Sequence, residues 1–358
     1  MEAPRNILLT LVLGLALAIM IGWLMVIGRS ILIPVVTAVI SVYVLNTATD
    51  LLRHLPVMRR LPMILLRGTV LIGFTLILFG IGLLISVTVR ELAELAPSYE
   101  ARIEGLVVQL TELFNVETDR TFTDLRQDFF AEINFQSYLL AFIGSITSLG
   151  ATVFLVVIYA IFLTSETGTF PQKIAAAFPQ SGEAERIRGV VNDINDRIGN
   201  YLAIKTLINI VLGAMSYVIL WSFNVDFALF WALMIALFNY IPYVGSLIGV
   251  MFPVVWSIAQ FGAIGTTLGL AALLTTAQVY VGNYLEPRWI GNQMNMSPFV
   301  VILSLSVWSA LWGLPGAILA IPLTSVFGIV LRSFEATRFI PILLTQRVPE
   351  EDLQDANA

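Results

Sequence analysis

Long tracts without a charged side chain are the feature that most constrains this sequence. Tracts that contain no Asp, Glu, Lys or Arg include 68–89, 133–165, 227–285 and 289–331. About 20 apolar residues cross the roughly 30 Å hydrocarbon core of a bilayer as a helix. Overall, 58% of the 358 residues are hydrophobic and 12% are charged, whereas a soluble domain has about 25% charged residues. The sequence therefore predicts an all-α polytopic membrane protein surrounded by lipid.

Charged residues divide the chain between these tracts. The apolar tract at 6–28 is long for a signal peptide, so we expect a retained first helix that forms a hairpin with the next tract, 30–49. The expected segments are three N-terminal spans (1–89), an acidic helical soluble insert (90–136), a fourth span (137–165), an amphipathic linker (166–200), a C-terminal membrane domain (201–334) and a tail (335–358).

The basic residues predict which side each segment faces. Arg53, Arg59, Arg60 and Arg67 cluster in the short stretch before the third span. An excess of Lys and Arg in short loops marks the cytoplasmic face. We therefore expect both termini in the cytoplasm and the acidic insert on the extracytoplasmic side.

Two of the charge-free tracts are interrupted by proline and glycine. The breaks lie at 239–245 and 312–316, and each is followed by a further proline, Pro253 or Pro322. Proline removes a helical donor, and backbone groups freed inside a bilayer must be buried in protein or line a watery cavity. Paired breaks of this kind predict a transport site. Each segment is either a bent span or a re-entrant hairpin, and Arg288 favours hairpins, which place 286–297 in the cytoplasm.

Polar residues near the breaks are candidates for a solute or ion pathway. Lys205 is the one charged residue in the span 201–225, close to its inner end, where a lysine commonly reaches water. Glu286 either pairs with Arg288 or binds a cation or proton. Pairing of Lys205 with Glu286 is a further alternative that no spacing rule tests. The candidates are Lys205, Asn239, Tyr240, Pro242, Gly245, Gln278, Asn283, Glu286, Arg288, Pro315 and Gly316.

Other functional classes have little support in the sequence. The chain has no cysteine and a single histidine, His54 in the basic stretch, so a thiolate metal site and a disulfide framework are excluded. No basic stripe indicates nucleic-acid binding. No Gly-x-Ser-x-Gly elbow and no phosphate-binding loop occurs. We therefore expect a protein that is not an enzyme, needs no cofactor, and transports its substrate along gradients rather than with ATP.

Four motifs in order resemble the autoinducer-2 exporter (AI-2E) family of bacterial membrane proteins. They are Tyr201-Leu202 with Lys205, the run 238–245, the run 283–288 and the run 313–322. The resemblance implies a permease of the bacterial inner membrane with about eight membrane segments, assembled as a homo-oligomer for which a pentamer is one candidate. One departure is Met296-Ser297-Pro298, where the family often has a histidine before the proline.

Three functions are compatible with these features. The first is export of a small polar solute resembling autoinducer-2, bound by Asn239, Tyr240, Gln278 and Asn283 between two moving gates. The second is a Na⁺/H⁺ antiporter in which Glu286 alternates between proton and sodium. The third is a non-transporting membrane scaffold that binds partners through its acidic insert. A scaffold needs no paired broken helices, which favours transport.

Overall fold

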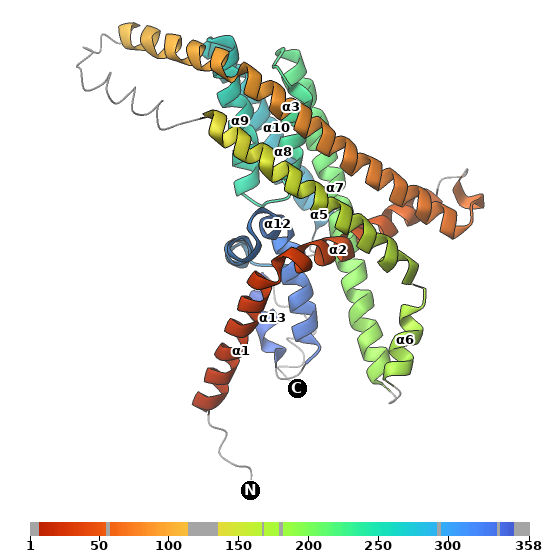
Figure 1. The fold of residues 1–358 in the computed structure, drawn as a ribbon. Coiled ribbons are helices and arrows are strands. Elements are labelled where there is room, and N and C mark those ends of the chain that lie inside the picture. Colours follow the sequence, from red (N-terminus) through yellow and green to blue (C-terminus); the bar gives the residue numbers. More distant parts are fainter. Residues whose placement is uncertain are drawn as a thin grey trace. The chain divides into compact units, whose positions relative to one another are not determined.

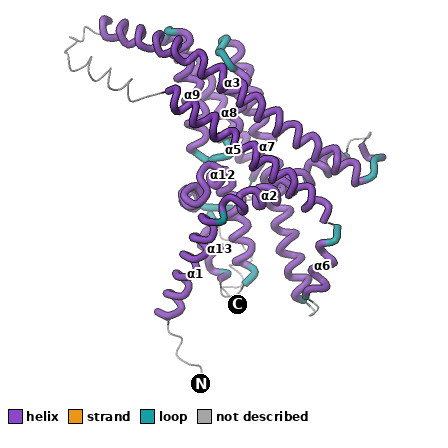
Figure 2. The backbone as a smooth tube through the Cα atoms, viewed as in Figure 1, coloured by secondary structure: helices purple, strands orange, loops and turns teal. Residues whose placement is uncertain are grey.

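Helices account for nearly all of the described structure, a computed structural model that describes residues 7–54, 58–113, 135–166, 168–178, 182–291, 295–334 and 337–346. In these residues the only β-type pairing is an isolated bridge between Met296 and Thr345 (Figure 2). Six of the helices in the described ranges are long and apolar enough to cross a membrane, or seven if the bent pair 152–166 and 170–177 is one span. This confirms the predicted all-α membrane architecture.

The helices form two compact units, each built from segments that are distant in the sequence. Unit 1 contains Met1–Arg59, Leu155–Leu202 and Asn292–Ala358, and unit 2 contains Arg60–Phe154 and Ala203–Gly291. The elements are α1 (Ile7–Ile27), α2 (Arg29–Arg53), η1 (Met58–Arg60), α3 (Met63–Leu113), α5 (Phe135–Glu166), α6 (Phe170–Ala177), α7 (Glu183–Ser222), α8 (Ala228–Phe238), α9 (Val244–Phe261), α10 (Ile264–Tyr280), η2 (Val281–Leu285), α11 (Glu286–Ile290), α12 (Pro298–Arg332) and α13 (Phe339–Leu344) (Figure 1).

Two helices continue across segment boundaries that the sequence suggested. Helix α3 does not stop at the end of the predicted third span but runs on to Leu113, while residues 114–134 of the predicted insert lie outside the described residues. Helix α7 joins the predicted amphipathic linker to the following span without a break. A change from an amphipathic to an apolar pattern therefore marks a change of surroundings here, not the end of a helix.

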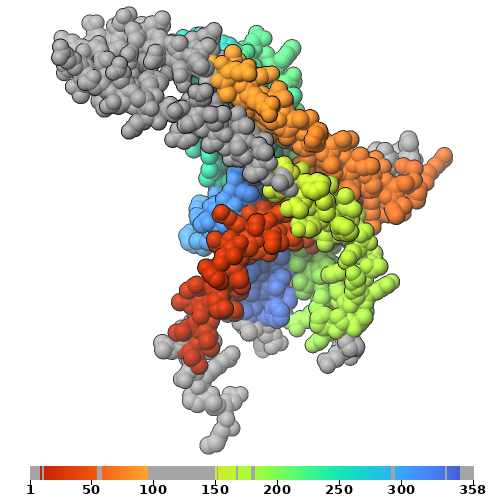
Figure 3. All heavy atoms as spheres, in the orientation of Figure 1, coloured from red at the N-terminus to blue at the C-terminus, as the bar shows by residue number. Residues whose placement is uncertain are grey.

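The first two helices meet at a single residue. Only Gly28 separates α1 from α2, and the helices diverge from it in Figure 1. Antiparallel helix pairs need a loop of about 2–5 residues. The tight connection therefore makes a bend, and the hairpin predicted for these two tracts is wrong. The apolar side chains of α1, coloured red in Figure 3, lie on the surface along its length, including Leu13 and Trp23. They suit contact with lipid.

The first broken segment, α8–α9 in unit 2, is a helical hairpin. At its open end, Gln260 Nε2 donates to the Asn224 carbonyl at 2.8 Å and Gln260 Oε1 accepts from the Asp226 backbone N–H at 2.9 Å. A continuous helix would separate these positions by about 54 Å. Further in, Gly249 packs on the backbone of Ile235. Both ends of the hairpin therefore lie at one end of unit 2, as the hairpin alternative predicted.

The second broken segment, α12 in unit 1, also folds back on itself. Gly313 has φ 64° and ψ −139°, which interrupts the helix. Trp308 Nε1 donates to Thr324 Oγ1 at 2.9 Å, although a continuous helix would separate the two residues by about 24 Å. Near the open end, the Ser297 N–H donates to the Leu344 carbonyl at 3.2 Å. In the described residues, each unit thus contains a Pro/Gly-broken segment that folds back as a hairpin.

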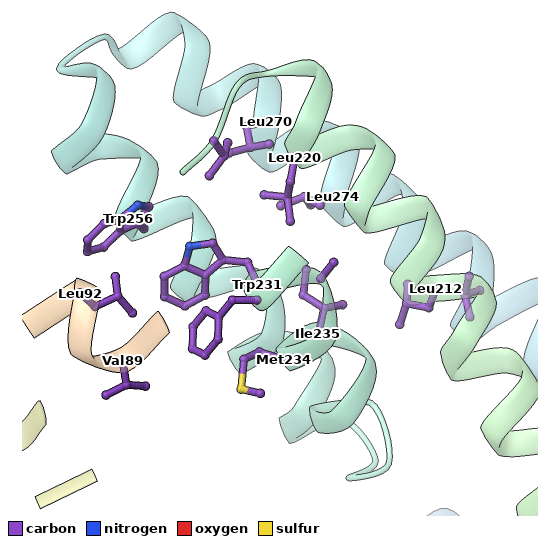
Figure 4. Packing of buried hydrophobic residues seen from close by; sticks show 14 of the residues in the cluster. Val89, Leu92, Leu212, Leu220, Trp231, Met234, Ile235, Trp256, Leu270 and Leu274 are labelled. Carbon is purple, nitrogen blue, oxygen red and sulfur yellow. The ribbon is translucent and has the colours of Figure 1, made fainter. Parts of the chain in front are cut away.

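An apolar core holds the first hairpin in unit 2. Figure 4 shows Trp231 and Ile235 of α8 between Leu92 of α3, Trp256 of α9 and Leu220 of α7. The Trp231 and Trp256 rings lie 5.9 Å apart. Leu212 and Leu220 of α7 and Leu270 and Leu274 of α10 are at most 1% exposed, so both helices contribute leucines to this core.

The hairpin makes a direct prediction for cysteine labelling. The parent chain has no cysteine, so Ser222→Cys, Ala263→Cys and Trp289→Cys each introduce a single exposed thiol. With an impermeant maleimide in intact cells, Ser222→Cys and Ala263→Cys should react from the same side, because both flank the open end of the hairpin. Trp289→Cys should react only from the other side. Labelling of Ser222→Cys and Ala263→Cys from opposite sides would show that α8–α9 crosses the membrane.

Candidate functional site

Polar residues of α7 face the tip of the first hairpin within unit 2. Lys205 and Asn209 are one helical turn apart, and each is 3% exposed. Positions i and i+4 share one face of a helix. Helix α10 runs antiparallel to α7, as the contact of Gly269 with the Phe223 ring shows further along. The hairpin tip, residues 239–243, meets this pair of helices at the level of the α7 polar residues.

Lys205 and Glu286 form a buried ion pair. Lys205 Nζ lies 2.6 Å from Glu286 Oε1, and the side chains are 4% and 28% exposed. Lys205 thus meets a carboxylate instead of extending to water. Arg288 donates to the Tyr284 hydroxyl at 2.8 Å and lies over that ring, so it is not the partner of Glu286. Of the pairings considered from the sequence, the structure therefore has Glu286 with Lys205 and not Glu286 with Arg288.

A π-helical turn positions Glu286. The five residues of η2 widen the helix directly before Glu286, and Pro287 follows. Proline has no backbone N–H to donate into the preceding turn, and single π turns are frequent at functional sites. The wide turn leaves the Asn283 side chain exposed, away from the Lys205–Glu286 pair. Of the candidates in 283–288, only Glu286 reaches the site.

Three amides form a hydrogen-bonded chain at the hairpin tip. Asn239 Nδ2 donates to Asn209 Oδ1 at 2.8 Å, and Gln278 Nε2 donates to Asn239 Oδ1 at 2.7 Å. Asn239 is 5% exposed and ends α8. Beside it, the Tyr240 and Thr206 hydroxyls are 2.7 Å apart. We call these five side chains the tip cluster. The cluster ties the tip to α7 and to α10 with uncharged groups only.

The remaining candidates belong to the two hairpin tips. Pro242 lies in the first tip, and Tyr243 after it has φ 60°, so helix α9 begins from a strained residue. A side-chain carbon on Gly245 would overlap the Phe238 carbonyl oxygen. In unit 1, Pro315 lies in the second tip, where a side-chain carbon on Gly316 would likewise overlap the carbonyl of Trp308. In both hairpins a glycine therefore permits close packing against the preceding helix.

Sequence reasoning did not single out Asn209 and Thr206. Both lie inside the span 201–225, where an apolar average conceals them. Their signal was the spacing of Lys205, Thr206 and Asn209, which gives one polar face to a helix that is otherwise apolar. Intramembrane polar residues on one face are usually buried against protein or line a pathway.

Within the described residues, no three His, Cys, Asp or Glu side chains come together. The site is instead a row of amides and hydroxyls one turn from an ion pair. Discontinuous helices whose tips meet buried polar groups are the construction of secondary transporters. The fold and the site together define a multi-pass membrane transporter.

Comparison with known proteins gives the family. The sequence profile of the AI-2E family transporters matches residues 9–336, and the chain belongs to this family. It is 28% identical over 340 residues to the AI-2 transport protein TqsA of Escherichia coli. The matched residues cover 93% of this chain and 96% of TqsA. A candidate transport protein of Haemophilus influenzae is 30% identical over 293 residues, 80% of this chain and 83% of that protein.

A further relative matches over a shorter length. It is a candidate transport protein of Borreliella burgdorferi, 33% identical over 204 residues, and the match spans 56% of each chain. With its apolar helices and these relatives, the chain is a multi-pass transporter of the bacterial inner membrane.

Proposed function

We propose that this protein exports a small, uncharged, polar organic solute, and that the tip cluster is its binding site. The observation that carries the proposal is the buried row of amides and hydroxyls at the tip of a re-entrant hairpin. A relative named as an AI-2 transport protein supports a furanone-like, hydroxyl-rich substrate. The family to which this chain belongs and the names of its relatives also support transport over a scaffold role.

The few charges of Ala203–Gly291, the part of unit 2 that carries the tip cluster, favour an uncharged substrate. Between Ala203 and Gly291 the only charged residues are Lys205, Asp226, Glu286 and Arg288. Lys205 and Glu286 neutralise each other, Asp226 lies at the open end of the hairpin, and Arg288 is exposed. A charged solute at the tip cluster would have no counter-ion and would be costly to desolvate.

The predicted sidedness supports export as the direction of transport. The basic residues before the third span predict that the Lys205–Glu286 end of unit 2 faces the cytoplasm. We further propose that the buried leucines of α7 and α10, beyond the tip cluster, close the other side. Solute would then enter from the cytoplasm, as an exporter requires. Assembly into a homo-oligomer remains part of the proposal, since it rests on the family resemblance.

Solute flux through proteoliposomes tests this function. Asn209→Leu and Gln278→Leu should each lower efflux of a labelled cyclic polyol by at least about tenfold, because each leaves a buried amide of the cluster unpaired. Thr276→Val is the matched control on α10: it is exposed, bonds only its own helix, and should leave flux unchanged. Equal flux in all variants would show that the tip cluster is not part of the transport pathway.

A second candidate function, Na⁺/H⁺ antiport, is favoured by the ion pair. Glu286 is partly exposed while Lys205 is buried, so a cation arriving from water could replace the ammonium at the carboxylate. The double variant Lys205→Met/Glu286→Gln removes both charges together. It should abolish sodium-dependent proton movement if Glu286 is the coupling site and leave solute flux intact if it is not.

A further inference from the structure

Asn239 is held in the way that a bound solute would be held. Its carboxamide lies between Asn209 of α7 and Gln278 of α10, with one hydrogen bond on each side. No other tip residue reaches both helices by hydrogen bonds in the described part of the chain. Asn209 and Gln278 belong to the unbroken helices, whereas Asn239 belongs to the tip.

The two outer amides keep unused hydrogen-bonding groups. Gln278 Oε1 is buried without a partner. Asn209 Nδ2 faces the Tyr240 hydroxyl, which also belongs to the tip, so displacement of the tip frees this donor. Turning all three amides together reverses the chain, leaves Gln278 with a free donor instead of a free acceptor, and keeps the Asn209 end beside the Tyr240 hydroxyl. Buried unpaired polar groups are costly, so these atoms are available to a ligand that offers both a donor and an acceptor.

The tip can leave this position more easily than a helix could. Residues 239–243 lie between helices, and Tyr243 is held at φ 60°, an uncommon conformation for a residue with a side chain. Besides Asn239, the tip is tied to α7 through Tyr240, whose hydroxyl lies 2.7 Å from that of Thr206. Release of the tip breaks these polar contacts, which a solute can replace, and it exposes the buried side chain of Ile241.

We propose that Asn239 is an internal ligand that occupies the solute site in this state, and that solute binds by displacing it from between Asn209 and Gln278. The group that replaces a carboxamide here must be uncharged and must carry a donor and an acceptor on neighbouring atoms. A vicinal diol or a primary amide meets this requirement. The inference rests on the proposed function and assigns opposite roles to amides that touch one another.

These roles predict changes of opposite sign in binding. Asn239→Ala empties the position between the outer amides, so a diol no longer competes with the tip and should bind about tenfold more tightly. Asn209→Ala and Gln278→Ala each remove a binding group and should weaken binding about tenfold. Asn239→Ser is the companion variant, because it shortens the side chain while keeping a small polar group at the end of α8.

Binding is measured by calorimetry on the full-length protein in nanodiscs. The probe is 1,4-anhydroerythritol, a cyclic vicinal diol, and tetrahydrofuran, which lacks both hydroxyls, is the control. A second readout needs no ligand. Ile241 is 6% exposed, and Ile241→Cys places a single thiol in the tip of a chain that has no other. Its reaction with a small maleimide should be about tenfold faster when Asn239→Ala is also present.

Two results would separate the possible failures. If the parent binds the diol, but Asn239→Ala weakens binding as much as Gln278→Ala and Ile241→Cys labelling is unchanged, the internal-ligand inference is overturned while the proposed function stands. If no variant binds the diol better than tetrahydrofuran, the solute class is overturned, and with it both the site and the proposed function.

Discussion

Replacing Glu286 by glutamine should destabilise unit 2 strongly, whereas replacing its partner should not. Glu286→Gln leaves the Lys205 ammonium, 4% exposed, without a counter-ion. Breaking a buried pair in this way costs about 3–5 kcal/mol of the free energy of unfolding. Lys205→Met instead leaves a carboxylate that is 28% exposed and can be hydrated. Its cost should be clearly smaller.

The double variant Lys205→Met/Glu286→Gln is the decisive comparison. Because it leaves no buried unpaired charge, it should recover most of the stability that Glu286→Gln loses. Unfolding in detergent, followed by circular dichroism against denaturant, measures all three variants and the parent. If the double variant were as unstable as Glu286→Gln, the pair would not be the cause of the loss.

The second large effect concerns the glycine that closes the first hairpin. Gly245→Ala should prevent α8 and α9 from packing, because the added carbon would overlap the Phe238 carbonyl, a backbone atom that cannot rotate away. Overpacking in a protein core typically costs about 1–3 kcal/mol, occasionally more. We expect the upper part of this range and a loss of solute flux, since the tip that carries Asn239 moves with α8.

Gly265→Ala is the matched control for this substitution. Gly265 lies in the first turn of α10, and a carbon added there meets nothing within 4 Å. The change should be neutral or slightly stabilising, because alanine favours helix over glycine. The melting temperature and the flux of both variants are compared with those of the parent. Normal flux through Gly245→Ala would show that the hairpin tolerates a wider separation than the structure indicates.

The sequence allowed the breaks to be predicted but not their three-dimensional result. Proline and glycine at 239–245 and 312–316 interrupt a helix for local reasons, so composition suffices to locate them. Whether the chain then crosses or returns depends on contacts such as Gln260 with Asn224, which are 36 positions apart. No periodicity within either helix encodes that contact. Charge on the flanking residues indicated the hairpins only through their expected side of the membrane.

The candidate site was predicted to a similar extent. Asn239, Gln278, Lys205 and Glu286 were named because polar residues are conspicuous in apolar surroundings. Asn239 and Gln278 join the amide chain, whereas Lys205 and Glu286 form the ion pair. This division depends on the antiparallel packing of α7 and α10, a feature of the tertiary structure. Asn283 met the same criterion of polarity, but the π turn leaves it outside the site. Residue type thus selects candidates, and helix phase decides among them.

The order in which the hairpin's partners are synthesised has a consequence for membrane insertion. Helix α9 alone is long and apolar enough to be accepted as a full crossing. The group that holds the tip from the other side, Gln278, emerges from the ribosome only after α9 is complete. A nascent chain therefore passes through a stage in which the wrong topology is available, and the return of α9 to its own side must be fixed late, once α10 is present. Biogenesis of this unit is expected to depend on the C-terminal half of α10 more than on the hairpin itself.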